Sequence, residues 1–103
     1  MVASSSNTES LRVTDLRFIQ ASAELRRSGL LGWLAVTLNG ALQIDGLTLR
    51  RTREGVLTVA YPRRRDRNGV EHSVVKPVSD DARRRIEAEI LAALAPMANE
   101  ARP

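Results

Sequence analysis

The chain has 103 residues, of which 43% are hydrophobic and 27% are charged, and its formal net charge is +4 at pH 7. Since this length provides one hydrophobic core, we expect a single folded domain rather than two. The sequence has no cysteine and only one histidine, His72, so disulfides, thiolate ligands and multi-histidine centres are excluded, and we expect a protein that is not an enzyme and holds no metal or cofactor.

Residues 1–10 are rich in serine and contain little that could pack, so we expect a flexible N-terminal tail. They lack both the basic start and the apolar stretch of an export signal. No segment approaches the roughly eighteen apolar residues of a membrane-spanning helix. The most apolar one, residues 30–38, is interrupted by Gly32 and Thr37. We therefore predict a cytoplasmic protein.

Two strands are predicted in the first part of the domain. The first begins at Leu11, and its apolar positions change phase at Asp15. Residues 20–29 either extend this strand or form a turn. The segment 30–38 is apolar in both phases and rich in β-forming residues, which predicts a central strand.

Two further strands complete the predicted meander. Asn39-Gly40 lies between two apolar runs and predicts a two-residue type I′ hairpin, because both positions of that turn require positive φ. The third strand is predicted over 41–51, with a bulge where its apolar phase changes at Asp45-Gly46. A fourth strand over 56–62 ends at Pro62, which has no amide hydrogen. Together these strands predict an antiparallel sheet.

A charged segment follows the fourth strand. Residues 63–69 are predicted to form a loop that turns at Asn68-Gly69. Residues 70–75 have the apolar pattern of a short fifth strand. Loop and strand together predict a hairpin.

A helix is predicted after this hairpin, with Ser79 or Asp80 as its N-cap and its apolar positions on one face. Since a proline disfavours helical geometry in the residue before it, we expect the helix to end before Pro96 and residues 96–103 to fray. The predicted fold class is therefore α+β. A single domain over 11–95 consists of a four- to five-stranded antiparallel meander followed by one C-terminal helix.

The aromatic residues and the strand over 30–38 indicate packing rather than base stacking. Phe18, Trp33 and Tyr61 are the only aromatic residues, and each lies in an apolar segment, so we expect them in the core. The strand over 30–38 would be covered by the helix on one face and by a second subunit on the other. This pattern predicts a homodimer.

The charge is concentrated in one part of the chain. Residues 50–85 include eleven basic and five acidic residues, whereas the rest of the chain has five basic and seven acidic ones. Such asymmetry favours a nucleic-acid partner, because arginines that contact phosphates release condensed counterions. The candidate nucleic-acid-binding residues are Arg63, Arg64, Arg65 and Arg67 in the predicted loop, Lys76, Arg83 and Arg84 around the helix start, and Arg50, Arg51 and Arg53 in a second cluster.

Two other interpretations of these arginines remain open at this point. Arginine runs also occur in ordinary solvated loops, and on the helix Arg83 and Arg85 can pair with Glu87 and Glu89 at i, i+4 spacing. The alternative function is a non-enzymatic adaptor whose arginines bind an acidic protein partner. No small-molecule substrate or membrane contact is expected in either case.

Several short motifs occur in the order found in one known family. V-T-D-L-R at 13–17 is similar to its opening V-T-D-V-R, and L-T-V-A-Y-P at 57–62 is similar to its L-F-V-A-M-P. R-R-D-R-N-G at 64–69 matches the end of S-K-R-x-x-x-G, and P-V-S-D-D-A-R-R-R-I at 77–86 matches the proline, arginine and isoleucine of P-I-N-S-x-x-R-x-x-I. The chain thus resembles the SpoVG (stage V sporulation protein G) family of small bacterial septation regulators.

The resemblance implies a small antiparallel sheet with a C-terminal helix, a homodimer joined through sheet strands, and regulation by site-directed binding of DNA or RNA. Arg64 and Arg65 correspond to the family's basic pair, and Arg63 replaces its serine. Glu71 stands where the family has an aromatic residue, and His72 begins the segment that replaces its R-D-I. The family includes members from bacteria that form no spores, so sporulation is not implied for this chain.

Overall fold

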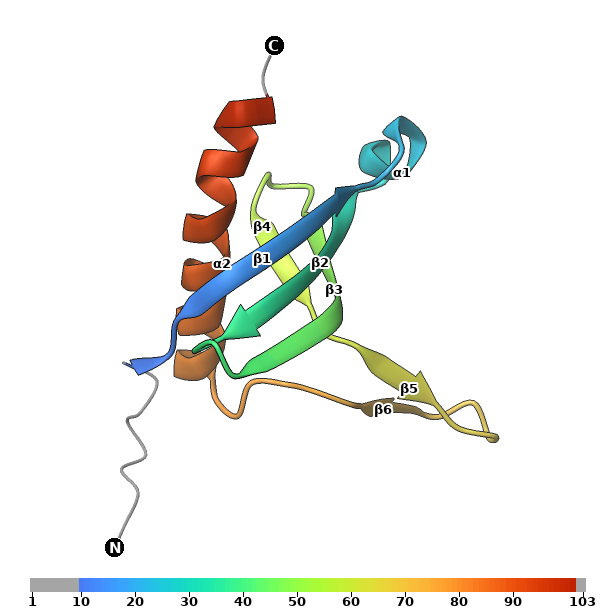
Figure 1. Cartoon of the computed structure of the whole chain (residues 1–103). Coiled ribbons are helices and arrows are strands. Elements are labelled where there is room, and N and C mark those ends of the chain that lie inside the picture. Colours follow the sequence, from blue (N-terminus) through green and yellow to red (C-terminus); the bar gives the residue numbers. More distant parts are fainter. Residues whose placement is uncertain (1–9, 102–103) are drawn as a thin grey trace, which may run out of the picture. The chain divides into compact units, whose positions relative to one another are not determined.

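The computed structural model describes the backbone of residues 10–101 and the side chains as far as Met97. The predicted tails are residues 1–10 and 96–103, and of these, residues 1–9 and 102–103 lie outside the described residues. The elements in chain order are β1 (Val13–Gln20), α1 (Ala23–Arg27), β2 (Leu30–Leu38), β3 (Leu42–Arg51), β4 (Leu57–Ala60), β5 (Arg63–Arg65), β6 (Glu71–Ser73) and α2 (Asp80–Ala101) (Figure 1).

The strands form two sheets. One is a four-stranded meander in the order β1-β2-β3-β4, and the other pairs β5 with β6. In the meander Leu49 of β3 lies opposite Val59 of β4 in an antiparallel register. The predicted α+β fold, with an antiparallel meander and one C-terminal helix, is therefore confirmed. The predicted fifth strand exists as β6, but it pairs with β5 rather than with the meander.

The chain divides into two compact units, and within the described residues the first comprises 10–16, 36–43 and 77–101. In this unit Asn39 and Gly40 have φ of 53° and 62°, and the Ala41 N–H donates to the Leu38 carbonyl at 2.9 Å. The predicted two-residue turn is thus confirmed. Its Asn39 side chain accepts from the Arg12 N–H at 2.8 Å, which ties the turn to the start of β1.

Helix α2 also belongs to the first unit. Ala82 and Ile90 are its buried residues, and Glu89 accepts a hydrogen bond from the Val13 N–H at 3.2 Å. Ser79 is the N-cap, because its side chain accepts from the Ala82 N–H at 3.1 Å and its carbonyl from the Arg83 N–H at 3.0 Å. The structure thus decides between the two caps that the sequence left open.

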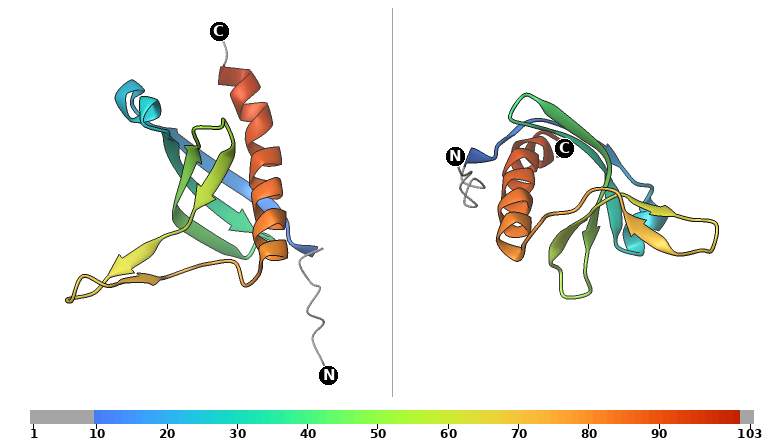
Figure 2. Two further views of the ribbon diagram at one scale, coloured as in Figure 1. Left: turned by 180° about the vertical axis from the view of Figure 1, so that it is seen from behind. Right: turned by 90° about the horizontal axis from the view of Figure 1, so that it is seen from below.

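The prediction that α2 ends before Pro96 is wrong, because the helix runs without a break to Ala101 (Figure 2). A proline lacks only its own amide hydrogen, so within a helix it removes the bond to the carbonyl four residues earlier, here that of Ala92. The bonds on either side can still form. Pro96 follows sixteen helical residues and precedes good helix formers, so the loss of one bond does not end this helix.

The second unit comprises residues 17–35 and 44–76. Its buried residues include Leu34, Leu47 and Leu49, and Leu47 is fully buried. Gly46 has φ of 80°, consistent with the glycine predicted where the apolar phase of β3 changes. Trp33 contradicts its predicted place in the core, because it is 38% exposed. Since neighbours in a strand point to opposite faces, burial of Leu34 places Trp33 on the outer face of β2.

The segment 20–29, left open between strand and turn, ends β1 and then forms the short helix α1. Ser22 caps it by accepting from the Leu25 N–H at 3.3 Å. Gly29, with φ of 104°, then reverses the chain into β2. None of the described helices is long and apolar enough to cross a membrane.

Gly32 allows β1 and β2 to approach closely. A Cβ at this position would lie 2.4 Å from the Ile19 carbonyl oxygen and 2.5 Å from the Phe18 ring, although Gly32 has no positive φ. We expect Gly32→Ala to lower the free energy of unfolding by about 3 kcal/mol, because the backbone neighbour cannot move aside. Denaturant unfolding followed by Trp33 fluorescence measures this.

The control for Gly32→Ala is Gly55→Ala, at a position where the backbone is left-handed (φ 86°) but no atom lies within 4 Å of the added Cβ. Its cost should be about 1 kcal/mol from backbone strain alone. An equal or smaller cost for Gly32→Ala would show that β1 and β2 do not approach closely here.

Candidate nucleic-acid interface

Strands β5 and β6 place the arginines predicted for a loop on a short antiparallel hairpin. Arg63 lies opposite Ser73, Arg64 opposite His72, and Arg65 opposite Glu71. Because side chains alternate along a strand, Arg63 and Arg65 share one face with Glu71, whereas Arg64 shares the other with His72. The three arginines are therefore presented on both faces of the hairpin, and all three are exposed.

On one face, a single carboxylate orders two arginines. Glu71 accepts contacts from Arg63 at 3.1 Å and from Arg65 at 3.3 Å, through different carboxylate oxygens. The arginine side chains are 62% and 68% exposed, and exposed ion pairs contribute about 0 to 1 kcal/mol. Two guanidinium groups share one carboxylate, so this face keeps a net positive charge and its weak pairs can be exchanged for phosphate contacts.

Arg64 and Arg67 are the hairpin arginines with no ion pair to any carboxylate of the described residues. Both are exposed, Arg64 on β5 and Arg67 in the turn that follows it. Their charge is not offset locally. With Arg63 and Arg65 they form the hairpin surface, four arginines beside the two carboxylates of Asp66 and Glu71.

Asp66 builds the turn between β5 and β6. Its Oδ1 accepts from the backbone N–H groups of Asn68 and Val70, both at 2.9 Å. Its own N–H donates to the Val70 carbonyl at 3.0 Å, and Gly69 has a left-handed φ of 81°. Asn68-Gly69 indicated the turn, but the part of Asp66 was not predicted, although an aspartate two residues before an asparagine at a turn is a recognisable signal.

The second oxygen of Asp66 binds His72. The Oδ2 atom lies 2.8 Å from His72 Nε2, so one carboxylate joins the turn to β6. The hydrogen bond with His72, followed by those from the Val70 and Asn68 amides, lowers the pKa of Asp66 below its ordinary value of 3.8. His72 is exposed, as expected for a surface histidine, and its partner in the hairpin is Asp66. No group of residues in the described chain could hold a metal ion.

The structure does not merge the second predicted cluster with the hairpin. Arg50 and Arg51 end β3, opposite Thr58 and Leu57 at the start of β4, and Arg53 lies in the turn between these strands. The hairpin begins just beyond the other end of β4 (Figure 1). The two clusters are therefore separated by the length of this strand. Lys76 is exposed and follows β6 in the same unit.

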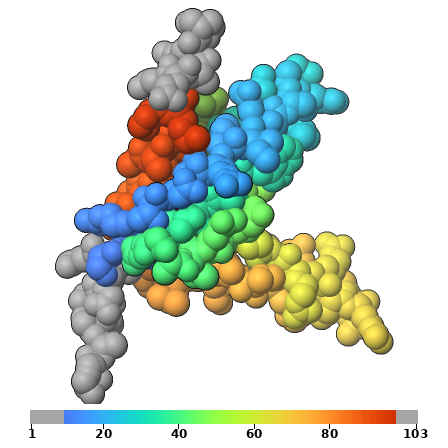
Figure 3. Space-filling model, viewed as in Figure 1, coloured from blue at the N-terminus to red at the C-terminus, as the bar shows by residue number. Residues whose placement is uncertain are grey.

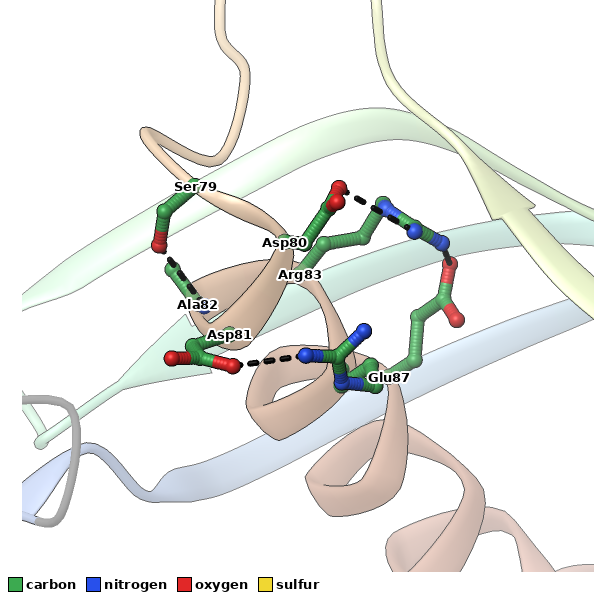
Figure 4. Close-up of polar contacts among 7 residues, drawn as sticks. Ser79, Asp80, Asp81, Ala82, Arg83 and Glu87 are labelled. Atoms are coloured by element: carbon green, nitrogen blue, oxygen red, sulfur yellow. Dashed lines mark hydrogen bonds and ion pairs between the residues drawn. The ribbon is translucent and has the colours of Figure 1, made fainter.

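The arginines at the start of α2 are paired with their own carboxylates. Arg83 contacts Asp80 at 3.3 Å and Glu87 at 4.0 Å, and Arg84 contacts Asp81 at 2.6 Å (Figure 4). These residues belong to the first unit, whereas the hairpin surface belongs to the second. Since these residues comprise two guanidinium groups and three carboxylates, they carry no excess positive charge.

The fold and the hairpin surface define a small α+β protein with a dense cluster of exposed arginines. The profile of the SpoVG family matches residues 11–95, so the chain belongs to the SpoVG family. Proteins named "Putative septation protein SpoVG" from Borreliella burgdorferi, Borreliella afzelii and Borrelia garinii subsp. bavariensis are each 31% identical over 78 residues, which cover 76% of this chain and 79% of theirs. The resemblance seen in the motifs is thus confirmed.

Asp66 predicts an acid-sensitive hairpin. Because its pKa is lowered in the folded hairpin, the ionised carboxylate stabilises the turn; this stability is present above pH 3.8 and is lost as the pH falls through the lowered pKa. We expect amide exchange of Asn68 and Val70 to quicken on such acidification. NMR exchange rates, corrected for the intrinsic effect of pH, measure this.

The control is Asp66→Asn, which cannot ionise. Its hairpin amides should exchange faster than those of the wild type at neutral pH and should lose the pH-dependent protection in the acid range. Protection in the wild type that stays constant through this range would show that the carboxylate does not stabilise the turn.

Proposed function

We propose that this protein is a regulatory, non-catalytic protein that binds DNA or RNA through the hairpin surface and acts as a homodimer. Membership of the SpoVG family supports a regulator, and the name of the relatives supports septation as the process. The observation that carries the proposal is that Arg64 and Arg67 have no carboxylate partner within residues 10–97, on a hairpin that holds four arginines and two acids.

The hairpin suits phosphate contacts better than base stacking. Guanidinium groups bind phosphates through two parallel N–H donors, and here they lie on both faces of a narrow ribbon. The described hairpin has no Phe, Tyr or Trp on which a base could stack, and its one imidazole, His72, is bound to Asp66. Phosphate contacts position a protein on nucleic acid, and an arginine can in addition bind guanine in the major groove. Lys76 and the second cluster extend the charge, and Arg83 and Arg84 contribute least because their carboxylates offset them.

The first test replaces the two arginines without carboxylate partners, in Arg64→Gln/Arg67→Gln. On duplex DNA the plot of log affinity against log salt concentration should become shallower by about 1.8, because each lost phosphate contact contributes about 0.9. Affinity near 0.15 M salt should fall in parallel. Fluorescence anisotropy of a labelled duplex across a salt series measures both quantities.

The matched control adds two negative charges elsewhere, in Ala41→Glu/Gln43→Glu, at exposed positions of the first unit. It changes the net charge equally but should leave the slope nearly unchanged. If both double variants have the same slope, the hairpin is not the contact site. A wild-type protein that binds an acidic polypeptide such as polyglutamate but neither DNA nor RNA at 0.15 M salt would instead establish the adaptor function.

The proposed homodimer uses the outer face of the meander. A Cβ on Gly32 would meet the Phe18 ring, so these two residues share the inner face of the sheet. Side chains alternate along a strand, so their neighbours Ile19 and Trp33 point to the outer face, where they are 67% and 38% exposed. Large aromatic and aliphatic side chains in this position are typical of subunit contacts. A second copy seated there would cover the face of β2 that the sequence predicts to be buried.

Ile19→Glu should weaken this dimer by about tenfold or more, because a buried charge would replace an apolar contact. Sedimentation velocity measures the dissociation constant, and emission of Trp33, the single tryptophan, should shift to longer wavelength as the protein dissociates on dilution. Val78→Glu, at a 92% exposed valine outside the meander, should leave the dimer intact. Equal effects of the two variants, or a wild type that is monomeric throughout, would exclude this interface.

A further inference from the structure

Two further arginines, which were not among the candidates from the sequence, lie beside the cluster of Arg50, Arg51 and Arg53. Arg26 and Arg27 end α1, and Gly29 follows two residues later. The Arg51 N–H donates to the Gly29 carbonyl at 2.8 Å, and a Cβ on Gly29 would lie 2.9 Å from the Arg51 carbonyl. The end of α1 is therefore in direct backbone contact with the end of β3. Segments more than twenty residues apart bring their arginines to one end of the second unit.

These arginines form what we term the α1 basic surface, which consists of Arg26, Arg27, Arg50, Arg51 and Arg53. All five are exposed, and none has an ion pair with a carboxylate of the described residues. Arg26 donates to the Ala21 carbonyl at 2.6 Å, which fixes its side chain without offsetting its charge. Glu24 and Glu54 are the acidic residues of the same segments. The surface therefore has a net positive charge larger than that of the hairpin surface.

The α1 basic surface and the hairpin surface lie at opposite ends of β4 in the same compact unit (Figure 1). In Figure 3 the α1 segment (cyan) and the hairpin (yellow) form two separate projections. Arg63 comes ten positions after Arg53, so their Cα atoms are at most about 36 Å apart. One turn of duplex DNA rises by about 34 Å. A single duplex can therefore reach both surfaces within about one helical turn.

We infer that the α1 basic surface is a second phosphate-binding surface, which contacts the same nucleic acid as the hairpin surface. The inference rests on the proposed function and adds a second contact region to it. Nucleic acid fits better than an acidic peptide, because duplex DNA is stiff and carries one charge per about 1.7 Å. Two separated cationic surfaces in one compact unit match a long, uniformly charged partner.

The test uses Arg27→Gln/Arg53→Gln, one arginine from each segment, neither of which makes a side-chain hydrogen bond within the described residues. On a duplex of about 20 base pairs, two helical turns, the salt slope should become shallower by about 1.8. Combined with Arg64→Gln/Arg67→Gln, the loss should reach about 3.6, because both surfaces contact one duplex. Ala41→Glu/Gln43→Glu is again the charge-matched control, and thermal unfolding checks that each variant folds.

The outcomes separate the inference from the proposed function. If the hairpin variant flattens the slope and the α1 variant does not, the second surface is excluded while the hairpin function stands. If neither flattens it, both fail. Since Leu25 and Val56 near this surface are 39% and 55% exposed, vesicles of anionic lipid are tested in parallel. Vesicle binding that the α1 variant loses, with its DNA binding unchanged, would assign the surface to a membrane and overturn the inference.

Discussion

The carboxylate of Asp66 is the group on which the proposed interface depends. Each strand of the hairpin has only three residues, and a ribbon of that size is marginally stable by itself. Three consecutive arginines add mutual repulsion. Asp66 opposes both effects, because one oxygen accepts two backbone amides of the turn while the other binds His72 on the returning strand. Glu71 then orders two of the three arginines. Two acids thus hold four like charges together without neutralising them.

Much of the meander could be predicted because its signals are local. The strand over 30–38 and the Asn39-Gly40 turn depend on adjacent residues, and a turn that needs two positive φ values accepts few others. Helix α1 could not be predicted in the same way, because five residues with one cap have little intrinsic helical stability. Its position depends on Gly29, whose contact with Arg51 joins segments far apart in the sequence.

The arginines of the candidate interface could be predicted from the composition of the segment, but their ion pairs could not. The sequence shows where arginines are concentrated, whereas the register of the strands decides which of them meet a carboxylate. Glu71 contacts Arg63 and Arg65 only because β6 pairs with β5 and not with β4. Pro62 explains this choice, since a residue without an amide hydrogen interrupts the ladder of β4. Its carbonyl instead accepts from the Val74 N–H at 3.2 Å, which closes the base of the hairpin. For α2 the pairs predicted from i, i+4 spacing are present, whereas the i, i+3 pairs of Asp80 and Asp81 were not predicted.

Glu71, at a position where the SpoVG sequence pattern that this chain resembles has an aromatic residue, limits the contacts open to the proposed interface. An aromatic side chain at that position could stack on a base, whereas a carboxylate repels phosphate and binds arginine. Here the register of β5 and β6 places Arg63 and Arg65 on the face of Glu71, which contacts both. Because these exposed pairs are weak, a phosphate can replace the carboxylate as the partner of either arginine. If the proposed interface binds nucleic acid, its selectivity comes from guanidinium contacts with base edges or from the shape of the nucleic acid. The hairpin of this chain therefore exchanges a stacking surface for an ordered set of cations.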